Sequence, residues 1–173
     1  MRAFLVCAIL AFCCLATGCK GFGYKVTTEN MSPALNIGDA FTVNPFADKS
    51  EPIKRFDIVV FQAPEETKKI SGESGDVRYV MRVIGLPNEK LEIKDNKIYI
   101  DDKLLDEPFE KFVDEKDARK NFRAIVIPEN EYFLMGDNRP HSNDSRYYKP
   151  ATIKREDIYG KVFEIFPEYY KKS

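Results

Sequence analysis

The sequence has no tryptophan, a single histidine (His141), and no cysteine beyond Cys19. All four cysteines lie in the first nineteen residues, so the chain after Lys20 can form no internal disulfide. An excess of either charge is lacking as well, because 27 basic and 28 acidic residues leave a formal net charge of -1. This balance gives no electrostatic reason to expect a nucleic-acid partner. We also expect no metal and no cofactor.

What the chain does contain is typical of a globular β protein. Its 173 residues suffice for one domain with a hydrophobic core, and 43% of them are apolar. Thirteen phenylalanines and nine tyrosines favour strands over helices. The composition therefore predicts a single, mainly β domain.

The first nineteen residues are predicted to be a targeting or anchoring segment that precedes the folded domain of residues 20–173. Met1 and Arg2 give a short positive start, and residues 3–18 form an uncharged, largely apolar run. That run is shorter than the roughly 20 residues that cross a bilayer as a helix, and its length suits the apolar core of an export signal.

The end of this segment leaves two kinds of tether open. Residues 15–19, Leu-Ala-Thr-Gly-Cys, are similar to a bacterial lipobox, which would make Cys19 a lipidated N-terminus. The alternative is an uncleaved membrane anchor. Either tether would hold the domain at the extracytoplasmic face of the membrane, in a bacterial cell envelope.

Short runs of β-branched and aromatic residues, separated by Gly, Pro, Asn and Asp, predict antiparallel strands from about Tyr24 onward. Asp95-Asn96 is a compact hairpin signal between two of these runs, and we expect another pair around Pro128. The expected strands are residues 40–43, 57–61, 78–84, 91–94, 97–100, 124–127, 131–135 and 160–166.

Three stretches do not follow the strand pattern. Residues 63–76 are polar and contain Gly and Ser, so we expect a loop there. Residues 106–121 are heavily charged and are expected to form a loop or a short helix. Residues 153–158 are expected to form a turn of helix before the last strand.

Four stretches carry a more specific pattern: residues 29–39 (ENMSPALNIGD), 55–61 (RFDIVVF), 79–87 (YVMRVIGLP) and 135–146 (MGDNRPHSNDSR). In this order they resemble the conserved boxes of the type I signal peptidases (peptidase S26). These enzymes remove leader peptides from exported proteins by means of a serine/lysine dyad. The resemblance implies a mainly β fold with antiparallel sheets of the signal-peptidase I type and a loop-rich insertion.

The two residues that perform the chemistry in that family differ in this chain. The family's nucleophile box reads Ser-Met-x-Pro-Thr-Leu, and its base box reads Tyr-x-Lys-Arg-Val-Ile-Gly-Leu-Pro. Asn30 stands at the serine position and Met81 at the lysine position. An amide is a poor nucleophile and a thioether is not a useful proton acceptor. The resemblance therefore predicts a catalytically inactive homologue.

Neighbouring residues offer one route to substitute chemistry. Ser32 lies two residues from Asn30, about 6–7 Å along an extended chain. A pairing of His141 with Ser32 or Ser142 would give an active leader peptidase with an unusual nucleophile. Arg82 cannot act as the base, because guanidinium stays protonated. A loop histidine is by default a solvated surface residue, so we expect His141 to lie at the surface.

The last box contains the residues that support the dyad in the family. By resemblance, Ser142 corresponds to the residue that orients the lysine, and Asp137, Asp144 and Arg146 correspond to a polar network behind it. Since the groups that they would orient are missing, we expect these residues to have a structural role here.

Two further residues are candidates for contact with a bound peptide. Some family members place an oxyanion-hole hydroxyl at the position of Thr28, which could keep a donor near a peptide carbonyl. Met31 could line the wall of a binding groove.

The resemblance leads to three hypotheses of function. The first is a membrane-tethered, extracytoplasmic protein without protease activity. It would bind extended peptides or exported proteins by β-augmentation along residues 24–31 and 77–83, in an assembly or chaperone-like role. The second is an active leader peptidase that cleaves signal peptides through an unusual nucleophile. The third is a lipoprotein domain with a purely structural role, which would bind no peptide.

Overall fold

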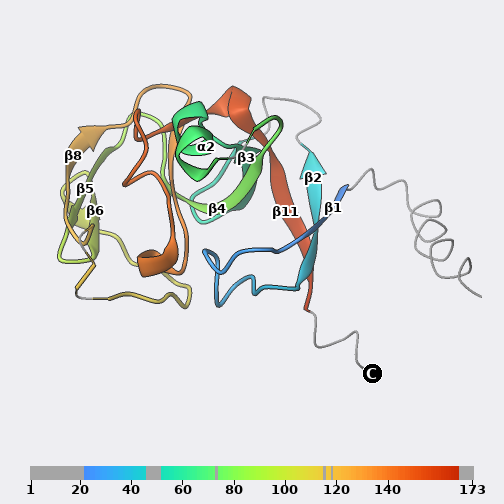
Figure 1. The fold of residues 1–173 in the computed structure, drawn as a ribbon. Helices are drawn as coiled ribbons and strands as arrows, with labels where there is room; N and C mark the ends of the chain where they lie inside the picture. The colour runs from blue at the N-terminus through green and yellow to red at the C-terminus, as the bar shows by residue number, and fades with distance from the viewer. Residues whose placement is uncertain (1–21, 46–51, 73, 115, 118, 168–173) are drawn as a thin grey trace, which may run out of the picture.

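Two antiparallel sheets make up most of the computed structural model, which describes residues 22–45, 52–72, 74–114, 116–117 and 119–167 (Figure 1). The tether predicted for residues 1–19, including Cys19, lies outside these ranges. Within them, no helix is long and apolar enough to cross a membrane.

The larger sheet has seven strands in the order β1-β2-β11-β3-β4-β9-β10. Neighbouring strands in it pair antiparallel. Its strands are β1 (Phe22–Lys25), β2 (Ala40–Pro45), β11 (Ile158–Phe166), β3 (Ile58–Gln62), β4 (Arg78–Gly85), β9 (Glu131–Met135) and β10 (Ile153–Lys154).

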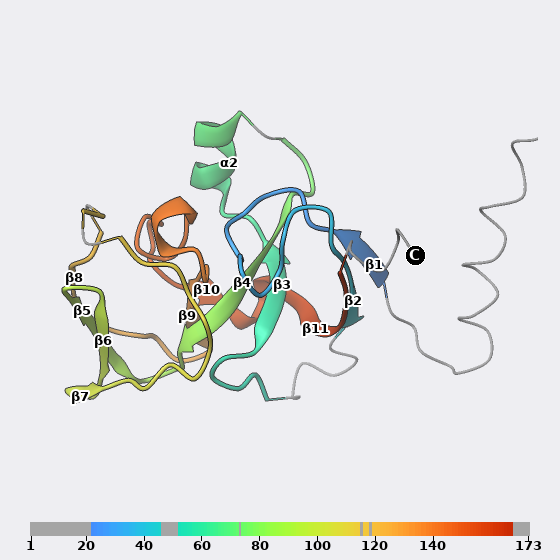
Figure 2. The ribbon, with the colours of Figure 1, turned by 90° about the horizontal axis from the view of Figure 1, so that it is seen from below.

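The smaller sheet has four strands, also antiparallel, in the order β7-β6-β5-β8. It lies at the opposite side of the molecule from β1 and β2 in both ribbon views (Figures 1 and 2). Its strands are β7 (Lys103–Leu104), β6 (Lys97–Ile100), β5 (Lys90–Lys94) and β8 (Phe122–Val126). The mainly β, antiparallel fold predicted from the sequence is confirmed.

Strands β4 and β9 join the two halves, because successive side chains of a strand point to opposite faces. Val83 and Leu134 pack into the core cluster of the larger sheet. Their neighbours Ile84, Phe133 and Met135 pack into the second cluster, with Leu91, Ile93 and Ile98 of the smaller sheet. Two strands thus contribute to both cores.

Turn chemistry fixes the small sheet as the sequence predicted. Asp95 and Asn96 adopt φ values of 47° and 62° between β5 and β6. Asp101 and Asp102 adopt 49° and 64° before β7. Consecutive residues with positive φ form the turns whose twist matches paired strands, so both hairpins follow from their local sequence.

The loop expected at residues 63–76 is wrong, because α2 (Glu65–Ser71) forms there. Pro64 precedes the helix, acidic residues occupy its first turn and basic residues its last. Gly72 ends it in the left-handed conformation with φ 71°. These features complement the helix dipole and cap its C-terminus, and they outweigh the polar composition that suggested a loop.

The pairing expected around Pro128 is also wrong, because β8 and β9 lie in different sheets. β8 pairs with β5, whereas β9 pairs with β4 and β10. Four of the five residues of β9 are buried, while β8 is largely exposed. A strand buried on both faces needs a central position in a sheet, which β9 obtains beside β4.

The remaining two stretches match their expectations in part. In residues 106–121 the described part contains no helix, so the loop alternative holds, and Phe112 forms an isolated bridge to Asn138. Residues 153–158 contain the short strand β10 followed by the 3-10 turn η2 (Arg155–Asp157). A second 3-10 turn, η1 (Arg139–His141), follows β9.

Candidate functional site

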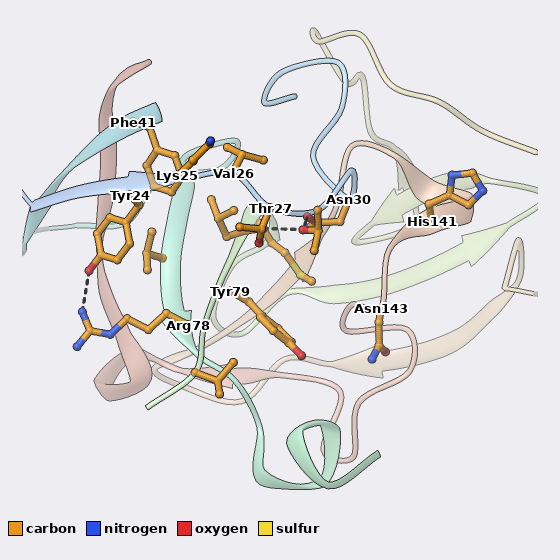
Figure 3. Close-up of a pocket in the computed structure, with 15 residues that line it drawn as sticks. Tyr24, Lys25, Val26, Thr27, Asn30, Phe41, Arg78, Tyr79, His141 and Asn143 are labelled. Atoms are coloured by element: carbon orange, nitrogen blue, oxygen red, sulfur yellow. Dashed lines mark hydrogen bonds between the residues drawn. The ribbon is translucent and has the colours of Figure 1, made fainter. Parts of the chain in front are cut away.

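A groove of about 410 Å³ lies between two segments that are far apart in the sequence (Figure 3). One wall comes from residues between Tyr24 and Asn30, and the other from Val77 to Met81 of the β4 region. Tyr24 and Arg78 lie at one end of the view, while His141 and Asn143 lie beyond Asn30 at the other. Both positions at which the sequence departs from the dyad, 30 and 81, line this groove.

The Asn30 side chain bridges the two walls. Its amide Nδ2 donates a hydrogen bond to the Val80 carbonyl at 3.0 Å, and its Oδ1 accepts one from the Thr28 hydroxyl at 2.6 Å. The Asn30 backbone is held in turn, because its carbonyl accepts from the N–H of Asn138 at 3.1 Å. Position 30 is therefore fixed through both its backbone and its side chain.

Gly136 permits this close approach of chain segments. A Cβ atom at this position would clash with the Asn30 carbonyl oxygen and with the Ser142 hydroxyl oxygen. Only glycine allows the end of β9 to lie against both. The Gly-Asp-Asn sequence of the last box thus positions the backbone beneath Asn30.

Met81 contributes an apolar side chain to the second wall of the groove. It is 2% exposed and packs in the core cluster of the larger sheet. The hydroxyl of Tyr148 lies 3.8 Å from its sulfur and donates a hydrogen bond to the Asn143 carbonyl at 2.6 Å. Burial, followed by the negative charge of Asp144, raises the pKa of the Tyr148 hydroxyl. The groups that contact the Met81 side chain here are thus uncharged.

Ser142 is buried with an unsatisfied hydroxyl. Among the residues described by the structure, its Oγ is the one buried side-chain polar atom that has no hydrogen-bond partner. Such an atom is unusual, since most buried polar groups are paired. Ser142 is also the residue whose counterpart orients a lysine in the resembling family. In this chain the position of that lysine is occupied by Met81.

Behind the groove, Arg82 and Asp137 form a buried, bidentate ion pair. Arg82 Nε lies 2.8 Å from Asp137 Oδ1, and Nη2 lies 2.5 Å from Oδ2. The guanidinium also donates to the Phe56 carbonyl and stacks over the Phe109 ring at 4.1 Å. Paired N–H donors on one carboxylate fix orientation as well as distance.

Arg146 forms a second buried pair, with Asp144, through Nε at 2.8 Å and Nη2 at 3.0 Å. Its Nη1 reaches Asp117 at 2.9 Å. Burial alone would lower the pKa of Arg146, but the charges of Asp144 and Asp117 outweigh it and raise the value. The Asp144 carboxylate also accepts from the Gly136 N–H at 3.2 Å.

A third arginine completes what we call the arginine network: Arg82, Arg139 and Arg146 with their carboxylate partners. Arg139 donates to the Gly136 carbonyl at 3.0 Å and forms a buried ion pair with Glu107. Glu107, Phe109 and Asp117 all belong to the loop of residues 106–121, which we call the insertion. Through them the network holds that insertion against β4 and the last box.

These insertion residues were missed in the sequence. Glu107 and Asp117 lie in a stretch with many charges and no strand periodicity, so nothing distinguished them from solvated acids. Their burial, at 5% side-chain exposure each, is the feature that separates them. The one sequence signal was the presence of Arg82, Arg139 and Arg146 in the third and fourth boxes, since arginines that are buried require carboxylate partners.

Neither serine is hydrogen-bonded to His141. The Ser32 hydroxyl donates to Asn36 Oδ1 at 3.0 Å, and the Ser142 hydroxyl has no partner. The His141 side chain is 61% exposed and lies 3.1 Å from the Glu29 carboxylate. The expectation of a surface histidine is confirmed, and the geometry does not assemble a Ser–His pair.

The two candidate peptide contacts differ in position. Thr28 is exposed and lines the groove, with its hydroxyl on Asn30. Met31 is fully buried in the core and does not line the groove, so its proposed place in the wall is wrong. Its side chain points into the cluster that also holds Leu35, since the chain turns at residues 30–35 instead of continuing as a strand. No cluster of three metal-binding side chains occurs among the described residues.

The architecture is that of a signal peptidase. A crystal structure of a signal peptidase I from Enterococcus faecalis V583 is similar, with a TM-score of 0.52 and 29% identity, covering 65% of this chain and 98% of the other.

The sequence comparisons agree. The family described as signal peptidase, peptidase S26, matches residues 1–167. Signal peptidase I V of Bacillus subtilis strain 168 is 33% identical over 149 residues, covering 80% of this chain and 82% of the relative. Signal peptidase I P of Bacillus subtilis subsp. natto is 34% identical over 174 residues, covering 96% and 88%. The chain belongs to the signal peptidase (peptidase S26) family.

Proposed function

We propose that this protein is a signal peptidase homologue without protease activity that binds extended segments of exported proteins. The observation that carries the proposal is the pair of residues in the groove, Asn30 and Met81. Neither an amide that donates to a backbone carbonyl nor a buried thioether can attack a peptide bond or accept the proton of a nucleophile.

The unsatisfied Ser142 hydroxyl supports the same proposal. In an active dyad a lysine at position 81 would offer an amine to this region, whereas methionine offers none. A desolvated lysine without a serine partner is unfavourable, and an unbranched apolar side chain of similar length removes that penalty. The groove has therefore exchanged a reactive pair for a neutral one, while Asp137, Asp144 and Arg146 keep the surroundings in shape.

Binding of an extended peptide requires a strand edge, and β4 has one. Its residues from Arg82 onward lie between β3 and β9, whereas residues 78–81 pair with β3 alone. The second side of that half faces the groove. A peptide could add there as a strand through its backbone. Thr28 on the opposite wall could then contact it.

The N-terminal sequence and the family support a location outside the cytoplasm. We propose that residues 1–19 tether the domain at the extracytoplasmic face of a bacterial membrane, by a lipid on Cys19 or by an uncleaved anchor. The proteins that it meets there are exported proteins and their signal peptides. Mass spectrometry of the mature N-terminus distinguishes the two tethers, since lipidation of Cys19 removes residues 1–18 and adds the mass of the acyl groups.

A cleavage assay tests the absence of activity. The soluble body is incubated with a leader peptide that contains an Ala-x-Ala site, and the products are followed by mass spectrometry. We expect no cleavage above that of buffer. Cleavage that is abolished by Ser32→Ala or His141→Ala would overturn the proposal in favour of an unusual nucleophile.

Restoration of the dyad provides the positive counterpart. The double variant Asn30→Ser with Met81→Lys places a hydroxyl and an amine on the two walls of one groove. We expect measurable cleavage of the same leader peptide, and none in either single variant. A double variant that folds and binds the peptide but cleaves none of it would show that more than two residues separate this groove from an active one.

Amide NMR tests peptide binding directly. Titration of the wild-type body with leader peptide should shift the resonances of Thr28 and Val80, while those of the distant Lys97 stay in place. A domain with a purely structural role would show no shifts at any peptide concentration.

An active leader peptidase is the second candidate, and identity of 33–35% to several signal peptidases I favours it. The same cleavage assay decides between the two. If this candidate is correct, the nucleophile must come from a rearrangement of the groove, because the Ser32 hydroxyl donates to Asn36 and is not hydrogen-bonded to His141.

A further inference from the structure

Only residues 78–81 of β4 have an edge that is not paired with another strand. Along this strand the backbone groups of odd-numbered residues face β3, as shown by the bonds of Val83 with Phe56 and Asp57 and by the bond from Ala63 to Val77. The even-numbered residues must face the other way. The N–H and C=O groups of Arg78 and Val80 therefore point into the groove, before Arg82 pairs with β9.

Asn30 takes the last of these groups. Its Nδ2 donates to the Val80 carbonyl, so this side chain occupies the place where a longer peptide strand would put its next N–H. The Thr28 hydroxyl holds the amide in that orientation. The edge that remains open runs from the Arg78 N–H through the Arg78 carbonyl to the Val80 N–H. The open group nearest to Asn30 is therefore a hydrogen-bond donor, the Val80 N–H.

We propose that the Asn30 side chain closes one end of the groove, so that the groove accepts the C-terminal end of a peptide with a free carboxylate and not a continuous chain. We call this closed form a blind groove. This inference rests on the proposed function, since it names the kind of peptide end that the same groove takes. In a strand parallel to β4, one ligand residue donates its N–H to the Arg78 carbonyl and accepts from the Val80 N–H. The side chain of Asn30 stops the strand after that residue.

The choice of a carboxylate over an ammonium end follows from the polar groups near Asn30. Two acceptors beside this end already hold a donor: the Val80 carbonyl accepts from Asn30 Nδ2, and Asn30 Oδ1 accepts from the Thr28 hydroxyl. An ammonium group would need free acceptors. The Val80 N–H, in contrast, is a donor that faces the groove.

The charge of the groove agrees. Its lining contains Lys25, Arg78 and His141 and no aspartate or glutamate. Arg78 is paired with Asp76, but Lys25 has no ion pair among those of the described residues. A lining without carboxylates favours an anionic ligand end over a cationic one. The chemical class is thus an extended peptide that ends in a carboxylate, such as a segment released by an earlier hydrolysis.

The test compares three forms of one fluorescein-labelled leader peptide that ends in Ala-Ser-Ala, by fluorescence anisotropy with the wild-type body. The forms are the free acid, the C-terminal amide, and the peptide extended past the last alanine. We expect the free acid to bind best. The other two should bind at least about tenfold more weakly, as the loss of a charge-assisted hydrogen bond predicts.

The variant Asn30→Ala then opens the end of the groove. The extended peptide should gain affinity until it equals the free acid within about threefold, because the Val80 carbonyl becomes available to its next N–H. Asn44→Ala, which removes an exposed asparagine of β2 outside the groove, should leave the ratio of the two affinities unchanged. Circular dichroism checks that both variants fold.

The outcomes separate the two proposals. If the wild type binds the extended peptide as tightly as the free acid, the blind groove is wrong and peptide binding stands. If the free acid is preferred but Asn30→Ala does not restore the extended peptide, Asn30 is not the stop and the inference fails. If no form binds, the proposed function fails and this inference fails with it.

Discussion

The groove around Asn30 and Met81 and the arginine network behind it share strand β4, yet their polar atoms are satisfied in different ways. Arg82 and Arg146 meet buried carboxylates with several charge-assisted hydrogen bonds each. On the groove side, Met81 offers no polar atom, and the buried Ser142 hydroxyl has no partner. The comparison indicates that the network does not depend on a reactive pair for its geometry, because its partners lie within itself and in the insertion.

The largest expected effect comes from breaking the network at Arg146. The variant Arg146→Ala leaves the carboxylates of Asp144 and Asp117 buried without their partner, which should lower the free energy of unfolding by about 3–5 kcal/mol. Urea denaturation followed by circular dichroism measures it. Lys154→Ala, which removes an exposed ion pair with Glu156, should cost less than about 1 kcal/mol. Equal losses in both variants would contradict a stabilising network.

The next largest effect is expected from a substitution that places a charge on the groove side. Met81→Lys buries an amine in an apolar site, which should lower the free energy of unfolding by about 2–4 kcal/mol at pH 7. Desolvation lowers the pKa of a buried lysine, so the unfolded state binds more protons and stability rises with pH. The loss of stability should therefore shrink as the pH approaches the pKa of a free lysine, about 10.4. Met81→Leu, the control, should cost less than about 1.5 kcal/mol with no such pH dependence.

Tyr148, which joins the two regions, should give a smaller and pH-dependent effect. Burial raises the pKa of its hydroxyl, so above about pH 10 the unfolded state releases a proton that the folded state keeps. Stability must then fall as the pH rises. Tyr148→Phe should cost about 1 kcal/mol at pH 7, through the lost bond to Asn143, and should flatten the alkaline decline. Identical alkaline slopes in both proteins would exclude Tyr148 as its source.

The smallest expected change in the free energy of unfolding is a gain, whereas the changes above are losses. Ser142→Ala removes a buried hydroxyl without a partner, which should leave the free energy of unfolding unchanged or raise it by up to about 1 kcal/mol. Ser145→Ala is the matched control, because its buried hydroxyl accepts from the Leu134 N–H at 3.0 Å. That variant should cost about 1–2 kcal/mol. Equal losses of stability in both variants would show that the Ser142 hydroxyl does have a hydrogen-bond partner.

Much of the fold could be predicted because its signals are local. The β5–β6 hairpin follows from Asp95-Asn96, and the central strands follow from short apolar runs. Helix α2 was missed although its end charges and Gly72 were visible, because a polar stretch of this length resembles a loop. The pairing of β8 was missed for another reason. Which strand lies beside it depends on the burial of β9, and burial is a property of the whole chain.

The site divides in the same way. The positions of Asn30 and Met81 on facing walls followed from the boxes, since their neighbours fix the register. The contacts of Glu107 and Asp117 could not be predicted, because many charged residues in the same stretch looked equivalent. The bond from Asn30 to Val80 joins residues fifty positions apart, and only the fold brings them together.

The two halves of strand β4 differ in how strongly the fold constrains them. Its second half contributes to two cores, whereas position 81 stands at the boundary where the strand becomes an edge. An exchange of side chain there alters what the groove can do and leaves every strand pairing intact. The fold and the chemistry of the groove can therefore change separately at this boundary, because the pairing of β4 uses backbone atoms and the chemistry uses the side chain.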